Sequence, residues 1–149
     1  MTNSTERQTF TLFTDGACRG NPGPGGWAYI LRTDDSEIEC SGGDPATTNQ
    51  RMEVTAVMRA LESLTAPANV VIYADSQYVT KGLVEWMDGW IARGWKNAAK
   101  KSVANQDLWR VLAELREKHT LTTHWVKAHA GHPENERCDE MAFAEAAKF

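Results

Sequence analysis

The stretch "FTLFTDGACRGNPGPGGW", from Phe10 to Trp27, constrains the fold more than any other part of the chain. An apolar, β-prone run leads directly into Asp15, and five glycines and two prolines follow before the next apolar segment begins. This density of glycine and proline predicts a turn between two strands. The first strand is then expected to be buried and yet to end on a carboxylate, which requires a chemical reason.

The remaining patterns predict a mixed α/β fold. Three strands joined by short turns come first, and helices then alternate with two further strands, so we expect an antiparallel meander continued by parallel strands with flanking helices. The helix over 48–64 has a Thr N-cap and an apolar stripe at Val57, Ala60, Leu61 and Leu64. The predicted strands are 9–14, 27–32, 38–42, 69–75 and 120–126, and the predicted helices are 48–64, 77–88, 107–118 and 133–148.

Length and composition indicate one soluble domain over residues 1–149. Residues 1–8 are polar, so we expect a frayed start rather than a secretion signal, no membrane span, and a cytoplasmic location. The three cysteines are widely spaced and form no C-x-x-C pair, which indicates reduced thiols. A zinc site built from His129, His132 and Cys138 has unsuitable spacing and lacks a fourth ligand.

Charge is unevenly distributed along the chain. The net charge is -4, which argues against indiscriminate nucleic-acid binding by the whole protein. Residues 89–106, which we call the basic protrusion, contain no acid, and on charge alone they are a solvated helical face. Their cationic residues are Arg93, Lys96, Lys100 and Lys101.

Two acidic residues come directly after apolar, β-prone runs. Asp15 follows "FTLFT" and Asp75 follows "VVIYA", so if these strands are parallel neighbours, both carboxylates emerge at one edge of the sheet. Ligands of such sheets bind beyond the carboxyl ends of the strands. Taken singly, each acid is more simply a turn or cap carboxylate that accepts from backbone N–H groups.

Two further acids share helix faces with apolar residues. Helical spacing places Glu53 on the face of Val57, and Asp139 on the face of Ala142, Phe143 and Ala146, so both are expected to point inward. Four acids near a core need compensation, because like charges in contact oppose ionisation. Mg²⁺ prefers carboxylate oxygens, and two such ions about 4 Å apart can activate water and stabilise a departing phosphodiester oxygen.

The chain resembles the type 1 bacterial ribonuclease H in four separated blocks. They are "FTDGACRGNPGPGGW", "TTNQRMEVTAV", "YADSQYV" and "WVKAHAGHPENERCDEMA", in order between Thr9 and about Ala147. The resemblance implies a five-stranded ribonuclease H-like fold and two-metal-ion cleavage of RNA in RNA–DNA hybrids, leaving 5′-phosphate and 3′-hydroxyl ends. It also implies two Mg²⁺ ions, with Mn²⁺ as an alternative, and a monomer.

The same resemblance assigns the catalytic residues. Asp15, Glu53, Asp75 and Asp139 match the metal-binding acids of the family, and His129 matches a histidine that assists proton transfer or product departure. An unperturbed histidine pKa near 6.5 suits that role. Ala128 stands where the family usually has glycine.

Substrate contacts are implied for both strands of the hybrid. An RNA strand is recognised through its 2′-hydroxyl groups, which amide side chains and turn backbone can contact. Ala46 replaces an arginine of some relatives, which predicts weaker phosphate binding. The residues matched to the RNA strand are Cys18, Gly20, Asn21, Asn49 and Gln50, with Glu53 reaching a 2′-hydroxyl. For the DNA strand, Tyr78, Trp86 and Trp90 match aromatic residues along a channel, and Thr48 and Asn105 match its phosphate pocket. Gln77 is a further substrate contact. The phosphate-facing surface is matched by Arg93, Lys96, Lys100 and Lys101, and Trp95 is assigned to packing.

Three other functions fit the sequence less well. The segment "GPGGWA" satisfies a dinucleotide-binding pattern, but a strand rather than a helix follows it, so no helix N-terminus faces a pyrophosphate. A non-catalytic hybrid-binding protein would lack one of the four acids. A DNA-cleaving nuclease of the same superfamily would not need the Asn and Gln residues assigned to the 2′-hydroxyl.

Overall fold

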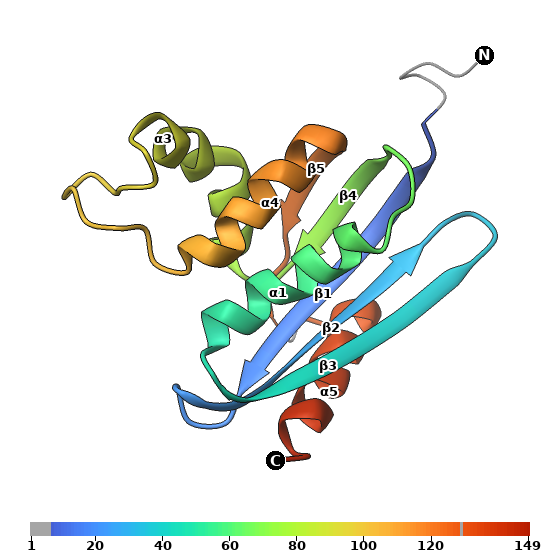
Figure 1. Cartoon of the computed structure of the whole chain (residues 1–149). Helices are drawn as coiled ribbons and strands as arrows, with labels where there is room; N and C mark the ends of the chain where they lie inside the picture. Colours follow the sequence, from blue (N-terminus) through green and yellow to red (C-terminus); the bar gives the residue numbers. More distant parts are fainter. Residues whose placement is uncertain (1–6, 129) are drawn as a thin grey trace.

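In a computed structural model that describes residues 7–128 and 130–149, five strands form one mixed sheet in the order β3-β2-β1-β4-β5 (Figure 1). β1 pairs antiparallel with β2 and parallel with β4, which pairs parallel with β5. This confirms the predicted fold class. The strands are β1 Thr9–Cys18, β2 Gly23–Arg32, β3 Glu37–Thr47, β4 Asn69–Ala74 and β5 Thr120–Trp125. The helices are α1 Asn49–Glu62, α2 Gln77–Lys81, η2 Gly82–Trp86, α3 Met87–Ala92, α4 Gln106–Lys118 and α5 Pro133–Ala146.

The two faces of the sheet bury different residues because successive side chains of a strand point to opposite faces. Helices α1 and α4 cover one face and α5 covers the other (Figure 1). The α1 and α4 side includes Leu12, Tyr29, Leu61, Ile72 and Trp109. The α5 side includes Phe13, Ala28, Ile30, Cys138 and Ala142. The buried stripe predicted on α1 is confirmed for Val57, Ala60 and Leu61, whereas Leu64 lies beyond the end of the helix and is only partly buried. Thr48 caps that helix by accepting from the backbone N–H of Arg51.

β1 is longer than the sequence predicts, and Asp15 does not end it. The parallel pairing with β4 stops at Thr14 opposite Ala74, but the antiparallel pairing with β2 continues as far as Cys18. The glycines that follow Asp15 therefore belong largely to strands, and the turn is confined to residues 19–22. Asp15 and Asp75 are each one residue beyond the last parallel pair, so the predicted common edge is correct although the predicted strand end is not.

Two glycines allow helices to approach the sheet from opposite faces. A Cβ added at Gly16 would lie 2.5 Å from the backbone nitrogen of Glu53 in α1. A Cβ added at Gly26 would overlap the carbonyl oxygen of Ala142 in α5. These close approaches bring the helices that carry Glu53 and Asp139 against the part of the sheet that holds Asp15.

We expect Gly26→Ala to destabilise the protein by about 1–3 kcal/mol, because α5 must move away from the sheet to accommodate the methyl group. Denaturant unfolding measures this difference. Gly89→Ala is the matched control: Gly89 lies in α3, and the atoms nearest an added Cβ belong to the flexible Arg93 side chain. Helix propensity should make this control neutral or stabilising. Equal losses in both variants would contradict the close-packing argument.

The single helix predicted over 77–88 is wrong in detail. The chain forms a short α-helix, one π-helical segment from Gly82 to Trp86, and the second short helix α3. The ring of Trp109 packs against Gly82, where an added Cβ would lie 2.7 Å from Cζ2. A π-helical segment inserts an extra residue per turn, so helical spacing counted on the sequence does not hold across it.

The buried face of α5 also differs from the prediction. Phe143 is 61% exposed, whereas Asn135, Cys138, Ala142 and Ala146 are buried. These residues are three or four positions apart, so they form one buried stripe that runs through Cys138. Asp139 is the next residue, and it lies half-buried at the margin of this stripe. Of the helices in the described ranges, none has the length and apolar character that crossing a bilayer requires.

Candidate active site

Three carboxylates meet at the edge of the sheet where β4 ends. Asp15 belongs to β1, Asp75 follows β4, and Glu53 comes from the first turns of α1. One oxygen from each lies within 4.8 Å of the others, and we call these three residues the acidic cluster. Asp15 shares a sheet face with Phe13, whereas α1, which carries Glu53, covers the opposite face. The carboxylates of Asp15 and Glu53 can therefore meet only beyond the end of β4, where that strand no longer separates the two faces.

Asp139 joins the acidic cluster from the other side. It lines a pocket together with Asp15 and Asp75, and its charge acts on both Asp15 and Glu53. The other residues of that pocket are Lys127, Ala128, His132, Asn135 and Glu136. The structure therefore brings together all four acids that the sequence singled out. His129, the fifth residue proposed for catalysis, lies outside the described residues.

Burial and mutual repulsion favour the protonated forms of Asp15 and Glu53 when no cation is bound. Burial, the charge of Asp75 and then that of Asp139 raise the pKa of Asp15 to about 8, against the lowering effect of the Gly16 N–H, which donates to Oδ1 at 2.8 Å. Burial raises the pKa of Glu53 well above its usual range, and the charges of Asp15 and Asp75 add to this. Strongly shifted carboxyl groups clustered in this way are typical of functional sites.

The acidic cluster has the properties of a site for a hard cation. Glu53 Oε2 is buried and has no hydrogen-bond partner among the described residues. Leaving a carboxylate oxygen buried without a partner is costly, and a divalent cation would remove that cost. Oxygen donors from three carboxylates, with Asp139 beside them, match the ligand preference of Mg²⁺ and Mn²⁺ rather than that of softer metals.

Two segments assigned to the RNA strand are linked directly. Asn21 Oδ1, in the turn after β1, accepts from the backbone N–H of Asn49 at 2.9 Å. The Cys18 thiol points toward the carbonyl oxygens of Gly20 at 3.2 Å and Thr47 at 3.5 Å. Gly20 has φ +68°, a conformation that favours glycine. The turn and the start of α1, which carries Gln50, therefore form one surface.

The aromatic residues of 78–90 form a cluster with a residue that the sequence analysis did not single out. Ring centroids lie 6.2 Å apart for Tyr78 and Trp86 and 6.0 Å apart for Trp86 and Trp90. Trp109 of α4 packs against Tyr78 at 5.5 Å and Trp90 at 5.2 Å, and its Nε1 donates to the Tyr78 hydroxyl at 2.9 Å. Trp86 remains 38% exposed, so its ring can contact a ligand.

Arg51 connects the two residues assigned to a phosphate pocket. Its backbone N–H donates to Thr48 Oγ1, and its guanidinium donates to Asn105 Oδ1 at 3.3 Å and to both oxygens of Asp107 at 3.0 and 2.8 Å. Asn105 Nδ2 in turn donates to the Tyr78 hydroxyl at 3.1 Å. Arg51 lies within the quoted block "TTNQRMEVTAV". Spacing along the sequence could not predict that its side chain links α1 to the start of α4.

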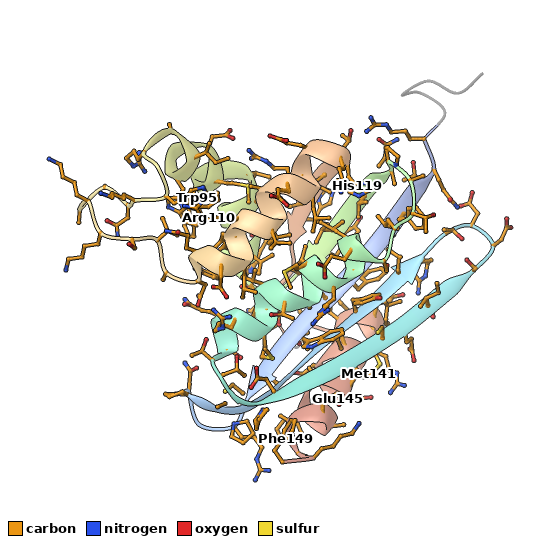
Figure 2. All side chains as sticks on the ribbon, viewed as in Figure 1. Trp95, Arg110, His119, Met141, Glu145 and Phe149 are labelled. Carbon is orange, nitrogen blue, oxygen red and sulfur yellow. The ribbon has the colours of Figure 1, made fainter. Side chains whose placement is uncertain are left out.

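The basic protrusion is ordered by its own backbone and by Trp95. The Asn97 side chain accepts from the N–H groups of Ala99 and Lys101, and Gln106 Nε2 donates to the Trp95 carbonyl at 3.0 Å. Trp95 is buried, as predicted, and the Arg110 guanidinium lies 5.3 Å from its ring centroid (Figure 2). The side chains of Arg93, Lys96, Lys100 and Lys101 are exposed on this framework.

Asn135 is another residue that the sequence analysis missed. It is buried on α5 one turn before Asp139, and its Nδ2 donates to the Tyr73 carbonyl oxygen at 3.3 Å. This bond ties the helix that carries Asp139 to the strand that leads to Asp75. The signal was present in the sequence, because residues four apart on a helix share a face.

These features define a class of protein: a mixed α/β sheet with an acidic, cation-binding type of site at the end of its central parallel strands. Comparisons with known proteins agree with this class. Residues 7–147 match the RNase H family. The chain is 56% identical over 137 residues to Ribonuclease H of Halorhodospira halophila (strain DSM 244 / SL1), which covers 92% of each chain. It is 59% identical over 131 residues to Ribonuclease H of Aromatoleum aromaticum (strain DSM 19018 / LMG 30748 / EbN1), covering 88% of this chain and 86% of that one.

A solved structure extends the comparison to three dimensions. The fold is similar to that of LC9-RNase H1, described as a type 1 RNase H with the type 2 active-site motif, at TM-score 0.85 and 28% identity over 95% of this chain and 74% of that one. The chain therefore belongs to the RNase H family, and within it to the bacterial type 1 group.

Proposed function

We propose that the protein is an endonuclease that hydrolyses the RNA strand of RNA–DNA hybrids and leaves 5′-phosphate and 3′-hydroxyl ends. One observation carries the proposal: three carboxylate oxygens from separate elements lie within 4.8 Å of one another, in a chain of the RNase H family. A structural role would not explain this arrangement, because carboxylates placed so close together raise the pKa values of Asp15 and Glu53 and oppose their ionisation.

Mg²⁺ is the proposed cofactor, with Mn²⁺ as an alternative. Asp15, Glu53 and Asp75 would hold it, together with Asp139 from the facing helix. Two bound ions would supply activation of the attacking water and stabilisation of the departing 3′-oxygen. The protein contributes the fixed position of the carboxylates, since Asp15 lies within a strand ladder and Glu53 within a helix.

The remaining residues orient the hybrid and move a proton. We assign contacts with RNA 2′-hydroxyls to the surface made by Cys18, Gly20, Asn21, Asn49 and Gln50. Gln77, the first residue of α2 and the second after Asp75, is assigned a further substrate contact. Tyr78, Trp86 and Trp90 are assigned to the DNA strand, where stacking contributes about 1–3 kcal/mol per contact. Thr48 and Asn105 are assigned to a DNA phosphate. His129 is assigned to proton transfer or product departure.

We further propose that residues 1–149 form a single domain that acts as a monomer in the cytoplasm, with the basic protrusion facing the DNA strand. Four exposed cations on an otherwise acidic chain support this orientation, because a local positive surface can contact phosphates without attracting nucleic acid everywhere else.

Cleavage of three labelled substrates tests the proposed function. An RNA–DNA hybrid, a duplex DNA and a duplex RNA of one sequence are compared with and without Mg²⁺. We expect cleavage of the RNA strand of the hybrid alone, only with the metal, and products that carry 5′-phosphates. Cleavage of duplex DNA at a similar rate would instead indicate a nuclease that does not recognise the 2′-hydroxyl.

The double variant Lys100→Ala/Lys101→Ala should raise KM about tenfold at low salt while kcat changes little, because each lost phosphate contact weakens binding rather than chemistry. Hybrid cleavage measured at several salt concentrations should also show a shallower salt dependence. Lys118→Ala/Lys148→Ala removes the same charge from exposed positions outside the basic protrusion and is the control. A lower kcat at unchanged KM would show that the two lysines do not face phosphates.

A further inference from the structure

Trp125 is a large aromatic residue that the proposed function leaves without a role. It is the last residue of β5, it is 49% exposed, and it pairs with Ala74, the last residue of β4. Its indole Nε1 donates to the backbone carbonyl oxygen of Asp75 at 2.9 Å. An exposed tryptophan is therefore anchored on the main chain of a residue of the acidic cluster.

The backbone around Asp75 makes this anchor important. Asp75 and Ser76 form a two-residue link between β4 and α2, so neither belongs to a ladder or a helix. By contrast, Asp15 is held within β1 and Glu53 within α1. Asp75 is thus the member of the acidic cluster whose main chain lies outside any strand or helix.

The bond from Trp125 acts at the point where the regular pairing ends. The backbone N–H of Val126 donates to the Ala74 carbonyl at 2.9 Å, and the Trp125 indole supplies the next bond, to the Asp75 carbonyl. This bond fixes the peptide plane that joins Asp75 to Ser76. Ser76 caps α2 by accepting from the N–H of Val79, so the same peptide also sets the start of α2.

We propose that Trp125 is a positioning residue: its indole N–H holds the Asp75 backbone so that the Asp75 carboxylate meets those of Asp15 and Glu53 in the geometry that binds a divalent cation. This inference rests on the proposed function. Groups that orient metal ligands without touching the metal typically change metal affinity about 10–100-fold when they are removed. The bond contributes little to overall stability, because an exposed indole N–H can donate to water in the unfolded chain.

Trp125→Phe tests the inference, since it keeps an aromatic ring and removes the N–H donor. We expect the dissociation constant of Mn²⁺, measured by calorimetry on the full chain without substrate, to rise about tenfold. The Mg²⁺ concentration that gives half-maximal hybrid cleavage should rise with it, and saturating metal should restore most of kcat. Thermal unfolding in chelator should match that of the wild type.

Trp86→Phe is the matched control, because it makes the same chemical change at another partly exposed tryptophan. It should leave Mn²⁺ affinity unchanged and act on the KM for the hybrid. If Trp125→Phe behaves in the same way, the ring contacts substrate and the inference is overturned. If it lowers the unfolding temperature with unchanged Mn²⁺ affinity, the role of the bond is structural and the inference is again overturned.

The wild-type measurements separate this inference from the proposed function. A wild-type protein that neither binds Mn²⁺ nor cleaves the hybrid would overturn the proposed function, and the inference with it. A wild-type protein that does both, beside a Trp125→Phe variant with the same metal affinity, would overturn the inference alone.

Discussion

Asp15→Asn is expected to reduce hybrid cleavage by about 10³-fold or more while the hybrid still binds with a dissociation constant within about threefold of the wild-type value. The amide has the shape of the carboxylate and can still accept from the Gly16 N–H, so the local structure of β1 should be kept. The variant loses one negative oxygen of the acidic cluster. Asp15 lies next to the last parallel pair of β1 and β4, at the edge of the sheet where the carboxylates of the cluster meet.

Single-turnover cleavage with saturating Mg²⁺ and hybrid binding in chelator measure the two quantities separately. Asp34→Asn is the matched control, because Asp34 is an exposed acid in the turn between β2 and β3, and it should cleave like the wild type. If both variants retain full activity, the acidic cluster is not the catalytic site. If Asp15→Asn loses binding and cleavage equally, the residue supports substrate binding rather than the reaction.

Regular periods in the sequence predicted the edge of the sheet for Asp15 and Asp75 and the inward faces of two helices for Glu53 and Asp139, and the resemblance predicted that all four form one site. Asp15 and Asp75 each come one residue after the last parallel pair of β1 and β4, which places them at one edge of the sheet. Glu53 shares the helical face of Val57, and the structure buries both. The proposed chemistry came from the resemblance to ribonuclease H. The match of residues 7–147 to the RNase H family confirms that resemblance.

Features that depend on contacts between distant segments could not be predicted in this way. The strand β1 continues past Asp15 because β2 still pairs with it, and no local pattern distinguishes glycines in a strand from glycines in a turn. In the π-helical segment, Gly82 packs against the ring of Trp109, which comes from a distant part of the sequence. Arg51, Trp125 and Asn135 act through hydrogen bonds to partners that are 50 or more positions away in the sequence, and such partners are fixed only by the folded chain.

The second large effect concerns stability without metal: in chelator, the protein should become less stable as the pH rises from 6.5 to 8. The folded-state pKa of Asp15, about 8, is far above the value of 3.8 that the unfolded chain would show. Between those values the folded protein keeps a proton that the unfolded protein has lost, so stability falls with rising pH by up to about 1.4 kcal/mol per pH unit. Glu53, whose pKa is also raised, acts in the same direction.

Other groups with shifted pKa values do not produce a loss of stability between pH 6.5 and 8. The pKa of His119 is lowered, mainly by burial, so its contribution has the opposite sign and is complete above about 6.5. The Cys138 thiol, whose pKa burial raises, would matter only as the unfolded thiol ionises above about 8. Urea unfolding at pH 6.5, 7 and 8 should therefore show a loss of up to about 2 kcal/mol from Asp15 in the wild type, to which Glu53 adds.

Asp15→Asn should remove the part of this slope that Asp15 contributes, while burial of Glu53 keeps its own part. The variant should be more stable than the wild type at pH 8 in chelator, because a neutral amide replaces a buried carboxylate that ionisation destabilises. Excess Mg²⁺ should stabilise the wild type most at pH 8, where binding displaces the fewest protons, and should stabilise Asp15→Asn much less. Equal pH slopes in both proteins would mean that Asp15 is ionised throughout this range, and the carboxylates would then be compensated by the folded chain itself rather than by a cation. The activity lost and the stability gained by one substitution would thus have the same cause, a concentration of negative charge that the fold maintains for the metal.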